Sequence, residues 1–158
     1  MLTNLFLLQR VGYLYYSDWG LHKIGRVGLD GSNHTSLVTG IHYWINALTL
    51  CHITKKLFWA DAKLDQIGYC DRDGTNCHQV RGLTLTHPFG ASVFDKYIYW
   101  TDWMSKGVYR ANKWTGANLK LLHHTNWEPM GIQVTRSVYC AIDIKFEFLH
   151  RSAEMLTL

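Results

Sequence analysis

The chain has 158 residues, of which 47% are hydrophobic and 18% are charged. This composition is typical of one globular domain and argues against a disordered segment. The formal net charge of +4 is spread over 16 basic and 12 acidic residues without a run of like charge, which disfavours nucleic acid as a partner. No stretch approaches the roughly 18 consecutive apolar residues of a membrane helix, so we expect no direct membrane insertion by this chain.

Residues 1–12 are expected to form an irregular N-terminal lead or a partial strand. Three similar aromatic stretches follow, "YLYYSDW" at 13–19, "KLFWADA" at 56–62 and "YIYWTDW" at 97–103. Aromatic side chains are favoured on half-buried strands, so these stretches predict an all-β fold. Each stretch closes with an aspartate, and the spacing between Asp18, Asp61 and Asp102 is 43 and then 41 residues.

A turn follows each aromatic stretch, at Asp30-Gly31, Asp73-Gly74 and Thr115-Gly116. Asp-Gly between alternating runs is a strong hairpin signal, and a two-residue turn at Asp73-Gly74 would set Cys70 and Cys77 opposite each other. Further strand-like runs lie before each turn and after it, and also upstream of the second and third stretches. About four short antiparallel strands every 40 to 45 residues is the pattern of a propeller blade.

The aromatic residues of the three stretches occupy two registers. Tyr16, Trp59 and Trp100 share one register, and their predecessors Tyr15, Phe58 and Tyr99 share the next. Because side chains alternate across a strand, we expect the two sets to fill opposite sides of each blade. The closing aspartates are expected to accept hydrogen bonds from backbone N–H groups or from a basic residue, as structural groups rather than catalytic acids.

The phrases "KLFWADAKLDQI" and "THPFGASVFDKYIYWTDW" resemble the class B, or YWTD, repeat of the low-density-lipoprotein receptor family. The resemblance covers residues 13–134, as repeats of about 13–55, 56–96 and 97–134, and residues 135–158 are expected to form a degenerate blade or a divergent tail. The first two signatures depart from the pattern, with "YSD" and "WAD" in place of "WTD". The motif residues are Tyr15, Tyr16, Asp18, Phe58, Trp59, Asp61, Tyr99, Trp100, Thr101 and Asp102.

The resemblance implies part of a six-bladed propeller, about three to four blades, from a large receptor-related protein. An open stack of this length predicts a fragment, a truncated isoform or an incomplete gene model that needs contacts to missing blades. The implied location is the secretory pathway and the extracellular space, as the ectodomain of a single-pass membrane receptor. EGF-like modules and calcium-dependent ligand-binding repeats would be neighbours, so calcium would belong to those modules and no cofactor to this chain.

The implied function is non-enzymatic binding of the protein ligands of endocytic receptors and of receptor chaperones, with ligand release in acid. Histidine charges in that pH range, and His22, His42, His87 and His124 are the candidates for such a switch. Two alternatives remain open, a matrix or adhesion propeller of the nidogen type and a Wnt co-receptor propeller. No nucleophile, paired-carboxylate or metal-ligand motif accompanies these patterns, so neither a catalytic nor a metal site is expected.

Several residues outside the motif are candidate sites. Asn33 begins the N-glycosylation triplet "NHT". Cys70 and Cys77 flank the second turn symmetrically and could form a cross-strand disulfide. Trp19, Trp44, Trp103 and Trp127 lie beside the signatures or in loops, where they either anchor a protein partner or pack between blades.

Overall fold

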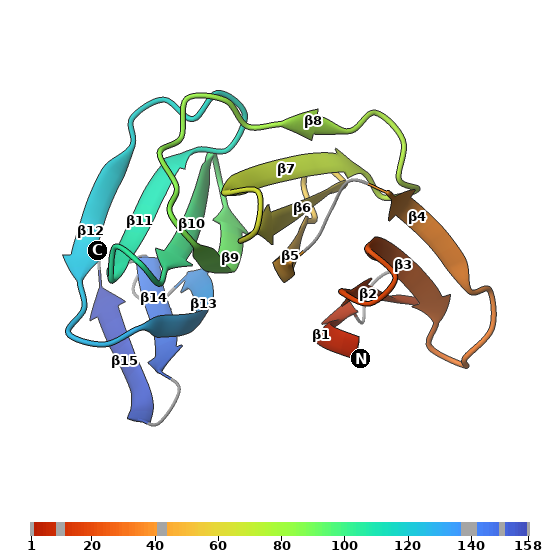
Figure 1. The fold of residues 1–158 in the computed structure, drawn as a ribbon, viewed down its shortest axis with the longest axis horizontal. Helices are drawn as coiled ribbons and strands as arrows, with labels where there is room; N and C mark the ends of the chain where they lie inside the picture. Colours follow the sequence, from red (N-terminus) through yellow and green to blue (C-terminus); the bar gives the residue numbers. More distant parts are fainter. Residues whose placement is uncertain (1, 9–11, 41–43, 137–141, 149–150, 158) are drawn as a thin grey trace. The chain divides into compact units, whose positions relative to one another are not determined.

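The computed structural model describes residues 2–8, 12–40, 44–136, 142–148 and 151–157. These residues form two units, 1–79 and 80–158, each with two antiparallel sheets (Figure 1). The first unit holds β1 (Leu2–Leu8), β2 (Tyr13–Asp18), β3 (Lys23–Gly28) and β4 (Thr35–Thr39), then β5 (Ile45–Cys51), β6 (Lys56–Asp61), β7 (Gln66–Asp71) and β8 (His78–Gln79). The second unit holds β9 (Pro88–Phe94), β10 (Tyr97–Asp102), β11 (Gly107–Asn112) and β12 (Lys120–His124), then β13 (Pro129–Arg136), β14 (Ile142–Phe148) and β15 (Arg151–Thr157).

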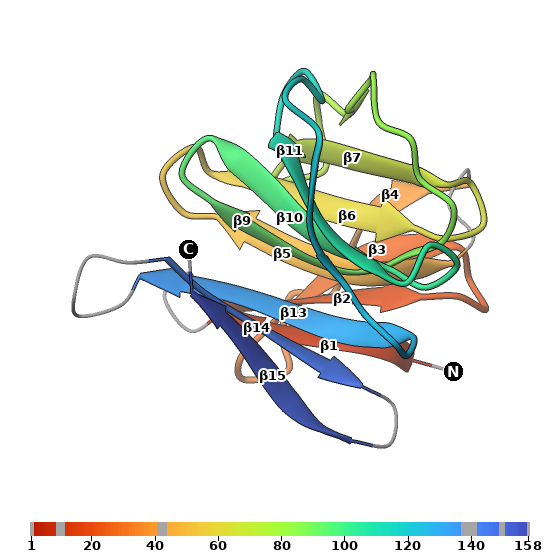
Figure 2. The same cartoon turned by 90° about the vertical axis from the view of Figure 1, so that its left-hand side faces the viewer.

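The strands of every sheet are neighbours in the order in which they follow along the chain. Three sheets have four strands, and the fourth pairs β13, β14 and β15 side by side (Figure 2). The predicted all-β class and the four-stranded antiparallel sheets are confirmed. No helix in the described part of the chain has the length and apolar character needed to cross a membrane.

Each four-stranded sheet begins one strand ahead of the aromatic signature, which forms the second strand as β2, β6 or β10. The boundaries of the sheets are therefore offset by one strand from the sequence repeats of 13–55, 56–96 and 97–134. Residues 2–8, expected as a lead or partial strand, form β1, which pairs with β2. Within 135–158, β14 and β15 extend the sheet that β13 begins.

Glycine on the third strand lets a signature ring lie flat on the sheet. Trp59 stands opposite Gly68, and a Cβ on that glycine would lie 2.4 Å from the indole. Tyr16 stands opposite Gly25 in the same way, with a distance of 2.5 Å. In the third sheet Tyr109 replaces the glycine, and its ring stacks on Trp100 with centroids 5.5 Å apart.

A hydrophobic core fills the space between the two sheets of each unit. In the first unit it contains Tyr15, Ile24 and Val38 from the first sheet and Ile45, Leu48, Leu50, Leu57, Trp59 and Cys70 from the second. In the second unit Tyr99 and Val108 pack against Val134 and Ile144. Each such buried side chain contributes about 1.5–3 kcal/mol relative to an exposed one, so these cores hold neighbouring sheets together.

A hydroxyl at the third signature position joins one sheet to the next. Thr101 Oγ1 donates to the Met130 carbonyl at 2.5 Å and accepts from Gly90 N at 2.8 Å. Ser17, its counterpart in "YSD", donates to the Ile45 carbonyl at 3.0 Å. The departure from threonine to serine therefore keeps the donor, whereas Ala60 in "WAD" has no hydroxyl to offer.

The turn after the third strand differs from the two-residue Asp-Gly turn considered from the sequence. Gly74 N donates to the Asp71 carbonyl at 2.9 Å, so Arg72 and Asp73 are the central residues. Gly74 follows them with φ of 86°, the left-handed conformation that continues a type I turn into the next strand. A Cβ at this glycine would lie 2.3 Å from the Leu37 carbonyl of β4, so close approach of the neighbouring sheet also requires glycine here.

We predict that Thr101→Val lowers the free energy of unfolding by about 1–3 kcal/mol, because it leaves the buried Gly90 N–H and Met130 carbonyl without their partner. Urea unfolding followed by tryptophan fluorescence measures this change. Thr101→Ser keeps the hydroxyl and is the matched control, with a smaller loss. Equal midpoints for the valine and serine variants would contradict a role for this hydrogen bond.

Candidate protein-binding rim

The signature strands β2, β6 and β10 each end at an aspartate, and we call the edge of each sheet at this end the rim. Asp61 is fully buried there, and its Oδ1 accepts hydrogen bonds from Trp44 N at 3.3 Å, Lys63 N at 2.9 Å and Leu64 N at 3.2 Å. Trp44 precedes β5, while Lys63 and Leu64 follow β6. One carboxylate thus fixes two loops of the rim.

Asp102 repeats this arrangement in the second unit. It is 1% exposed and accepts from Thr86 Oγ1 at 2.6 Å, Thr86 N at 2.9 Å, His87 N at 3.1 Å and Ser105 N at 3.2 Å. Burial by itself would raise the pKa of Asp102, but the hydrogen bonds outweigh it and hold the pKa below its usual value. Asp18 is half-buried and accepts from Leu21 N at 3.0 Å.

Two tryptophans meet on the rim of the first unit. Trp19 is half-buried, and its Nε1 donates to the Ile45 carbonyl at 3.1 Å, so this side chain packs between neighbouring sheets. Trp44 lies beside it, with ring centroids 6.3 Å apart, but remains 43% exposed. The Lys63 ammonium stands 5.2 Å from the centre of the Trp44 ring. Trp44 is thus a rigidly supported aromatic surface next to a cation.

On the rim of the second unit, Trp103 is stacked rather than displayed. Its ring lies 4.9 Å from Phe89 at an interplanar angle of 3° and 5.6 Å from His87 at 26°. Trp127 is 51% exposed, and its carbonyl accepts from Thr125 Oγ1 at 2.7 Å. Of the four tryptophans proposed from the sequence, Trp44 and Trp127 therefore present open surface, and Trp19 and Trp103 mainly pack.

Sequence reasoning missed the exposed aliphatic side chains of the rim. Met104 is 72% exposed, Leu21 64% and Leu64 40%. All three stand two or three residues after a closing aspartate, in the turn to the third strand. A large apolar residue in a turn was the signal that could have identified them.

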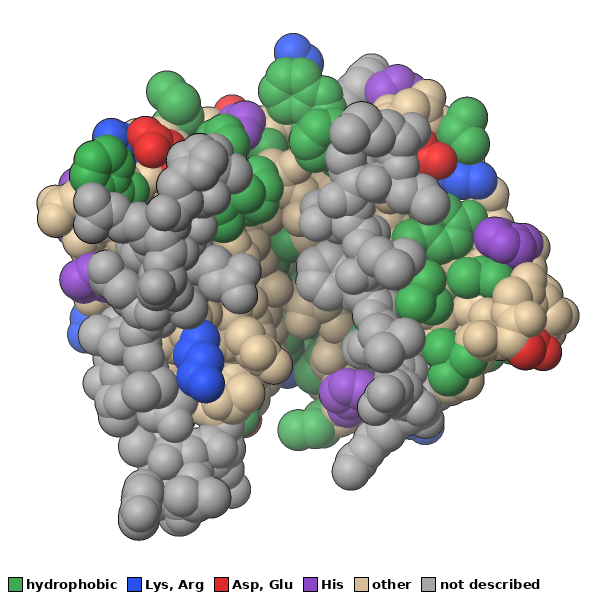
Figure 3. All heavy atoms as spheres, turned by 90° about the horizontal axis from the view of Figure 1, so that it is seen from below, with side chains coloured by type: hydrophobic (Ala, Val, Ile, Leu, Met, Phe, Trp, Pro, Cys, Tyr) green, Lys and Arg blue, Asp and Glu red, His purple; other side chains and the backbone are tan. Residues whose placement is uncertain are grey.

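The remaining predicted sites are the glycosylation triplet and the histidines. Asn33 is exposed in the β3–β4 connection with φ of 55°, and its Nδ2 donates to Ser32 Oγ. His22 and His124 are exposed, and His42 lies outside the described residues. No cluster of three or more potential metal ligands occurs among the residues that were described. On the face shown in Figure 3, basic and acidic side chains are interspersed among hydrophobic ones.

Cys70 and Cys77 are free thiols in the structure, so the disulfide considered from the sequence is not formed there. The β7–β8 register pairs Tyr69 with His78, and its continuation sets the two cysteines opposite each other. The Cys77 thiol donates to the Gly74 carbonyl at 3.3 Å and also interacts with the Cys70 thiol, which is buried in the core. Burial also raises the pKa of both thiols, which keeps them protonated.

A family model and two curated relatives point to the low-density lipoprotein receptor family. The model of the low-density lipoprotein receptor repeat class B matches residues 12–51. A vitellogenin receptor of Solenopsis invicta is 33% identical over 136 residues, which is 85% of this chain and 8% of the relative. The vitellogenin receptor Yl of Drosophila melanogaster is 33% identical over 120 residues, which is 75% of this chain and 6% of the relative. The chain thus spans less than a tenth of the length of either relative.

Among solved structures, a chain of a nidogen/laminin complex matches with a TM-score of 0.78 and 25% identity, over 92% of this chain and 56% of that one. The hydrazine synthase of Kuenenia stuttgartiensis matches with a TM-score of 0.70 at 10% identity, over 99% of this chain and 49% of that one, which shows a shared fold alone. These findings confirm the resemblance to the class B repeat and the assignment of the sheets to an incomplete YWTD propeller.

We predict that Asp102→Asn lowers the free energy of unfolding at neutral pH by about 1–3 kcal/mol, because an amide cannot accept all of these hydrogen bonds. The folded-state pKa lies below the unfolded value of about 3.9, so the ionised carboxylate stabilises the fold above that pH. This stabilisation is lost as the pH falls through the folded-state pKa. Denaturant unfolding of both proteins between neutral pH and about pH 3 should show the difference shrinking in acid.

Asp18→Asn is the control for this prediction, because Asp18 is less buried and accepts one hydrogen bond from the described residues. Its effect on stability should be smaller at every pH. A constant difference between Asp102→Asn and the parent chain across the pH range would contradict the assignment.

Proposed function

Because the chain carries a low-density lipoprotein receptor class B repeat, we propose that it is a non-enzymatic protein-binding module of an endocytic receptor ectodomain. The observation that carries the proposal is the 33% identity to two vitellogenin receptors over most of this chain. The module would act in the extracellular space and bind protein ligands of such receptors, or receptor chaperones. No cofactor is part of the proposal, and calcium would belong to neighbouring modules.

The rim supplies surfaces suited to this role. Exposed aromatic side chains are common anchors of protein interfaces, especially when the surrounding structure holds them rigidly. Trp44 rests on Trp19, and the loop that carries it is hydrogen-bonded to Asp61. Trp127 is tied through its carbonyl to the buried Thr125. The Trp44 ring would therefore lose little conformational freedom on binding, and the Trp127 backbone is held in place.

A matrix or adhesion module is the second candidate. The likeness to a chain of the nidogen/laminin complex, with a TM-score of 0.78, favours it. A receptor module and a matrix module present similar blades, so the ligand separates the two functions. Vitellogenin serves as the probe for the first and laminin as the probe for the second.

We predict that the immobilised chain binds vitellogenin in surface plasmon resonance and that Trp44→Ala or Trp127→Ala weakens binding about tenfold or more, as for other interface anchors. Ile53→Ala is the control, because Ile53 is 84% exposed but lies in the turn between β5 and β6, away from the rim. Binding of laminin without vitellogenin would support the matrix function instead. Equal losses for Ile53→Ala and Trp44→Ala would contradict the rim as the binding surface.

Acid-dependent release belongs to the same proposal. We choose His87 among the candidate histidines because its ring stacks on Trp103 at the rim and its backbone N–H donates to Asp102. Protonation would place a charge in this stack and alter a bound surface. In the same measurement, dissociation should be faster at about pH 5.5 than at neutral pH for the parent chain and less pH-dependent for His87→Gln. An unchanged pH dependence in that variant would exclude His87 as the switch.

Secretion predicts glycosylation at Asn33, since its triplet lies in an exposed connection. We expect the chain made in insect cells with an added export signal to carry a glycan that peptide-N-glycosidase removes. Thr35→Ala destroys the triplet and should give the mass of the bare chain, while Thr39→Ala, at the end of β4, leaves it intact. An unmodified Asn33 in the secreted parent chain would contradict this expectation.

A further inference from the structure

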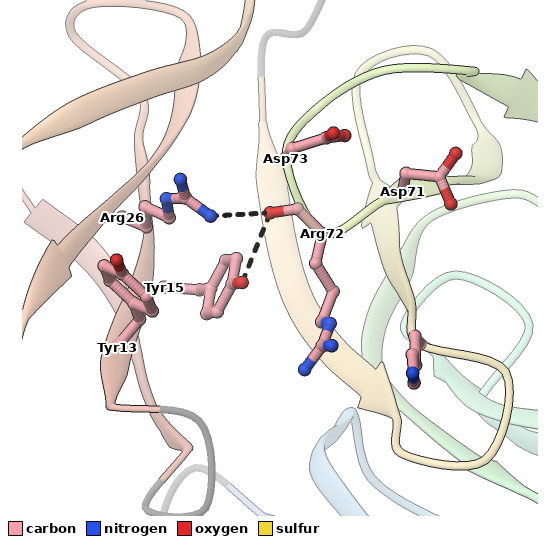
Figure 4. A pocket seen from close by; sticks show the side chains of 7 residues that line it. Tyr13, Tyr15, Arg26, Asp71, Arg72 and Asp73 are labelled. Carbon is pink, nitrogen blue, oxygen red and sulfur yellow. Dashed lines mark hydrogen bonds between the residues drawn. The ribbon is translucent and has the colours of Figure 1, made fainter.

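A cavity of about 360 Å³ lies in the first unit at the edge where the signature strands begin, which is the end opposite to the rim (Figure 4). Its lining residues come from both sheets of this unit: Tyr13, Tyr15, Arg26, Lys55, Asp71, Arg72 and Asp73. The volume lies within the range of natural ligand sites. None of these residues contributes to the rim, so the cavity needs a separate explanation.

One wall of the cavity is held in a fixed geometry by the first sheet. Tyr13 and Tyr15 alternate along β2 and share a face, and Arg26 stands opposite Tyr15 on β3. The Arg26 guanidinium lies 4.6 Å from the centre of the Tyr13 ring. The Arg72 carbonyl of the neighbouring sheet accepts from Tyr15 Oη at 3.2 Å and from Arg26 Nη1 at 3.5 Å (Figure 4).

The two acidic residues of the cavity already have partners in the second sheet. Asp71 forms an ion pair with Lys56 at 2.7 Å and accepts from Asn76 Nδ2 at 2.7 Å. Asp73 accepts from Thr75 N at 3.0 Å and Thr75 Oγ1 at 2.7 Å. These contacts lower the pKa of both carboxyl groups, chiefly the hydrogen bond from Lys56 for Asp71 and that from Thr75 for Asp73. The two acids therefore stay ionised within the turn.

The cationic residues of the cavity have no such counter-charge. Arg26, Lys55 and Arg72 form no ion pair with any carboxylate among the described residues. Three cations and two acids line the cavity, and Lys56 outside the lining already neutralises Asp71, so the cavity carries an excess of positive charge. Figure 4 shows the Arg72 side chain running from the neighbouring sheet past Tyr15 and away from Asp73. A pocket of this kind complements a carboxylate, which pairs with the cations while the aromatic ring supports the Arg26 guanidinium.

We propose that this cavity binds the carboxylate of an aspartate or glutamate presented by a peptide segment of a protein partner. The guanidinium of Arg72 and the ammonium of Lys55 pair with the carboxylate, and Arg26 and Tyr13 form the supporting wall. The size of the cavity and its position at an exposed sheet edge suit one acidic side chain and its neighbouring backbone. This interaction is independent of ligand binding at the rim.

The second unit identifies which residues to change. Tyr97, Tyr99 and Arg110 repeat the wall, with Tyr99 opposite Arg110 and the guanidinium 4.4 Å from the Tyr97 ring. The tyrosine and arginine wall is thus part of the repeated blade, whereas Lys55 and Arg72 reach the cavity from the neighbouring sheet. Substitutions at these two positions test the proposal without removing the wall.

The test is a titration of the nitrogen-15-labelled chain, followed by NMR, with the blocked peptide acetyl-Gly-Glu-Glu-Gly-amide. We expect saturable shifts of the Tyr15, Arg72 and Asp73 amides and weaker binding at higher salt. Arg72→Gln retains the backbone carbonyl that holds Tyr15, and Lys55→Asn suits the φ of 56° at that position. Each substitution should weaken binding about tenfold, the effect of losing one charge-assisted contact.

Lys120→Gln is the matched control, since Lys120 is exposed on β12 in the other unit and should leave peptide affinity unchanged. The glutamine peptide acetyl-Gly-Gln-Gln-Gly-amide should cause no saturable shift. The proposal is overturned if the glutamine peptide binds equally well, or if Arg72→Gln and Lys55→Asn bind as the parent does. It is also overturned if acetate or phosphate saturates the cavity at lower concentration than the glutamate peptide, since the site would then select small anions.

Discussion

The contact between neighbouring sheets is the interaction on which the rest of this structure depends. A single blade leaves an apolar face exposed, and each unit covers one such face with the next sheet. Tyr15 and Trp59 meet from opposite sheets in the first core, and Tyr99 meets Val134 in the second. The Ser17 and Thr101 hydroxyls add a hydrogen bond to the backbone of the adjoining sheet. Packing and a directional bond together set the spacing at which loops of two sheets can form one surface.

The two edges of the blades are stabilised by different chemistry, and this difference separates the proposed functions. At the rim, buried carboxylates bind backbone N–H groups of two loops and so support exposed Trp44 on one unit. At the opposite edge, a backbone carbonyl accepts from Tyr15 and Arg26 and leaves cations facing a cavity. A neutral aromatic anchor suits a broad protein interface, whereas unpaired cations suit an acidic side chain.

Features that depend on interactions within one strand or one hairpin could be predicted from the sequence, and features that depend on packing between sheets could not. The aromatic strands and their order within a sheet followed from alternation and spacing, and the closing aspartates were expected to accept backbone hydrogen bonds. The Asp73-Gly74 pair predicts a hairpin whether the two residues are the centre of the turn or not. The backbone shows that Arg72 and Asp73 are the central residues and that Gly74 follows them. The sequence could not show that Trp44 is exposed whereas Trp103 is stacked on Phe89. Both tryptophans lie close to a signature motif, and only the packing around each ring differs.

By itself the sequence determined an all-β chain of repeated blades, because periodic aromatic residues and turn glycines act within one strand or one hairpin. Only the tertiary structure shows which contacts are made by the positions that differ from one repeat to the next. Serine in "YSD" keeps the bond to the next sheet, and Arg26 meets the carbonyl of a residue 46 positions further along the chain. Such contacts depend on how two blades pack against each other. The spacing of residues within a single repeat does not determine the distance between one blade and the next.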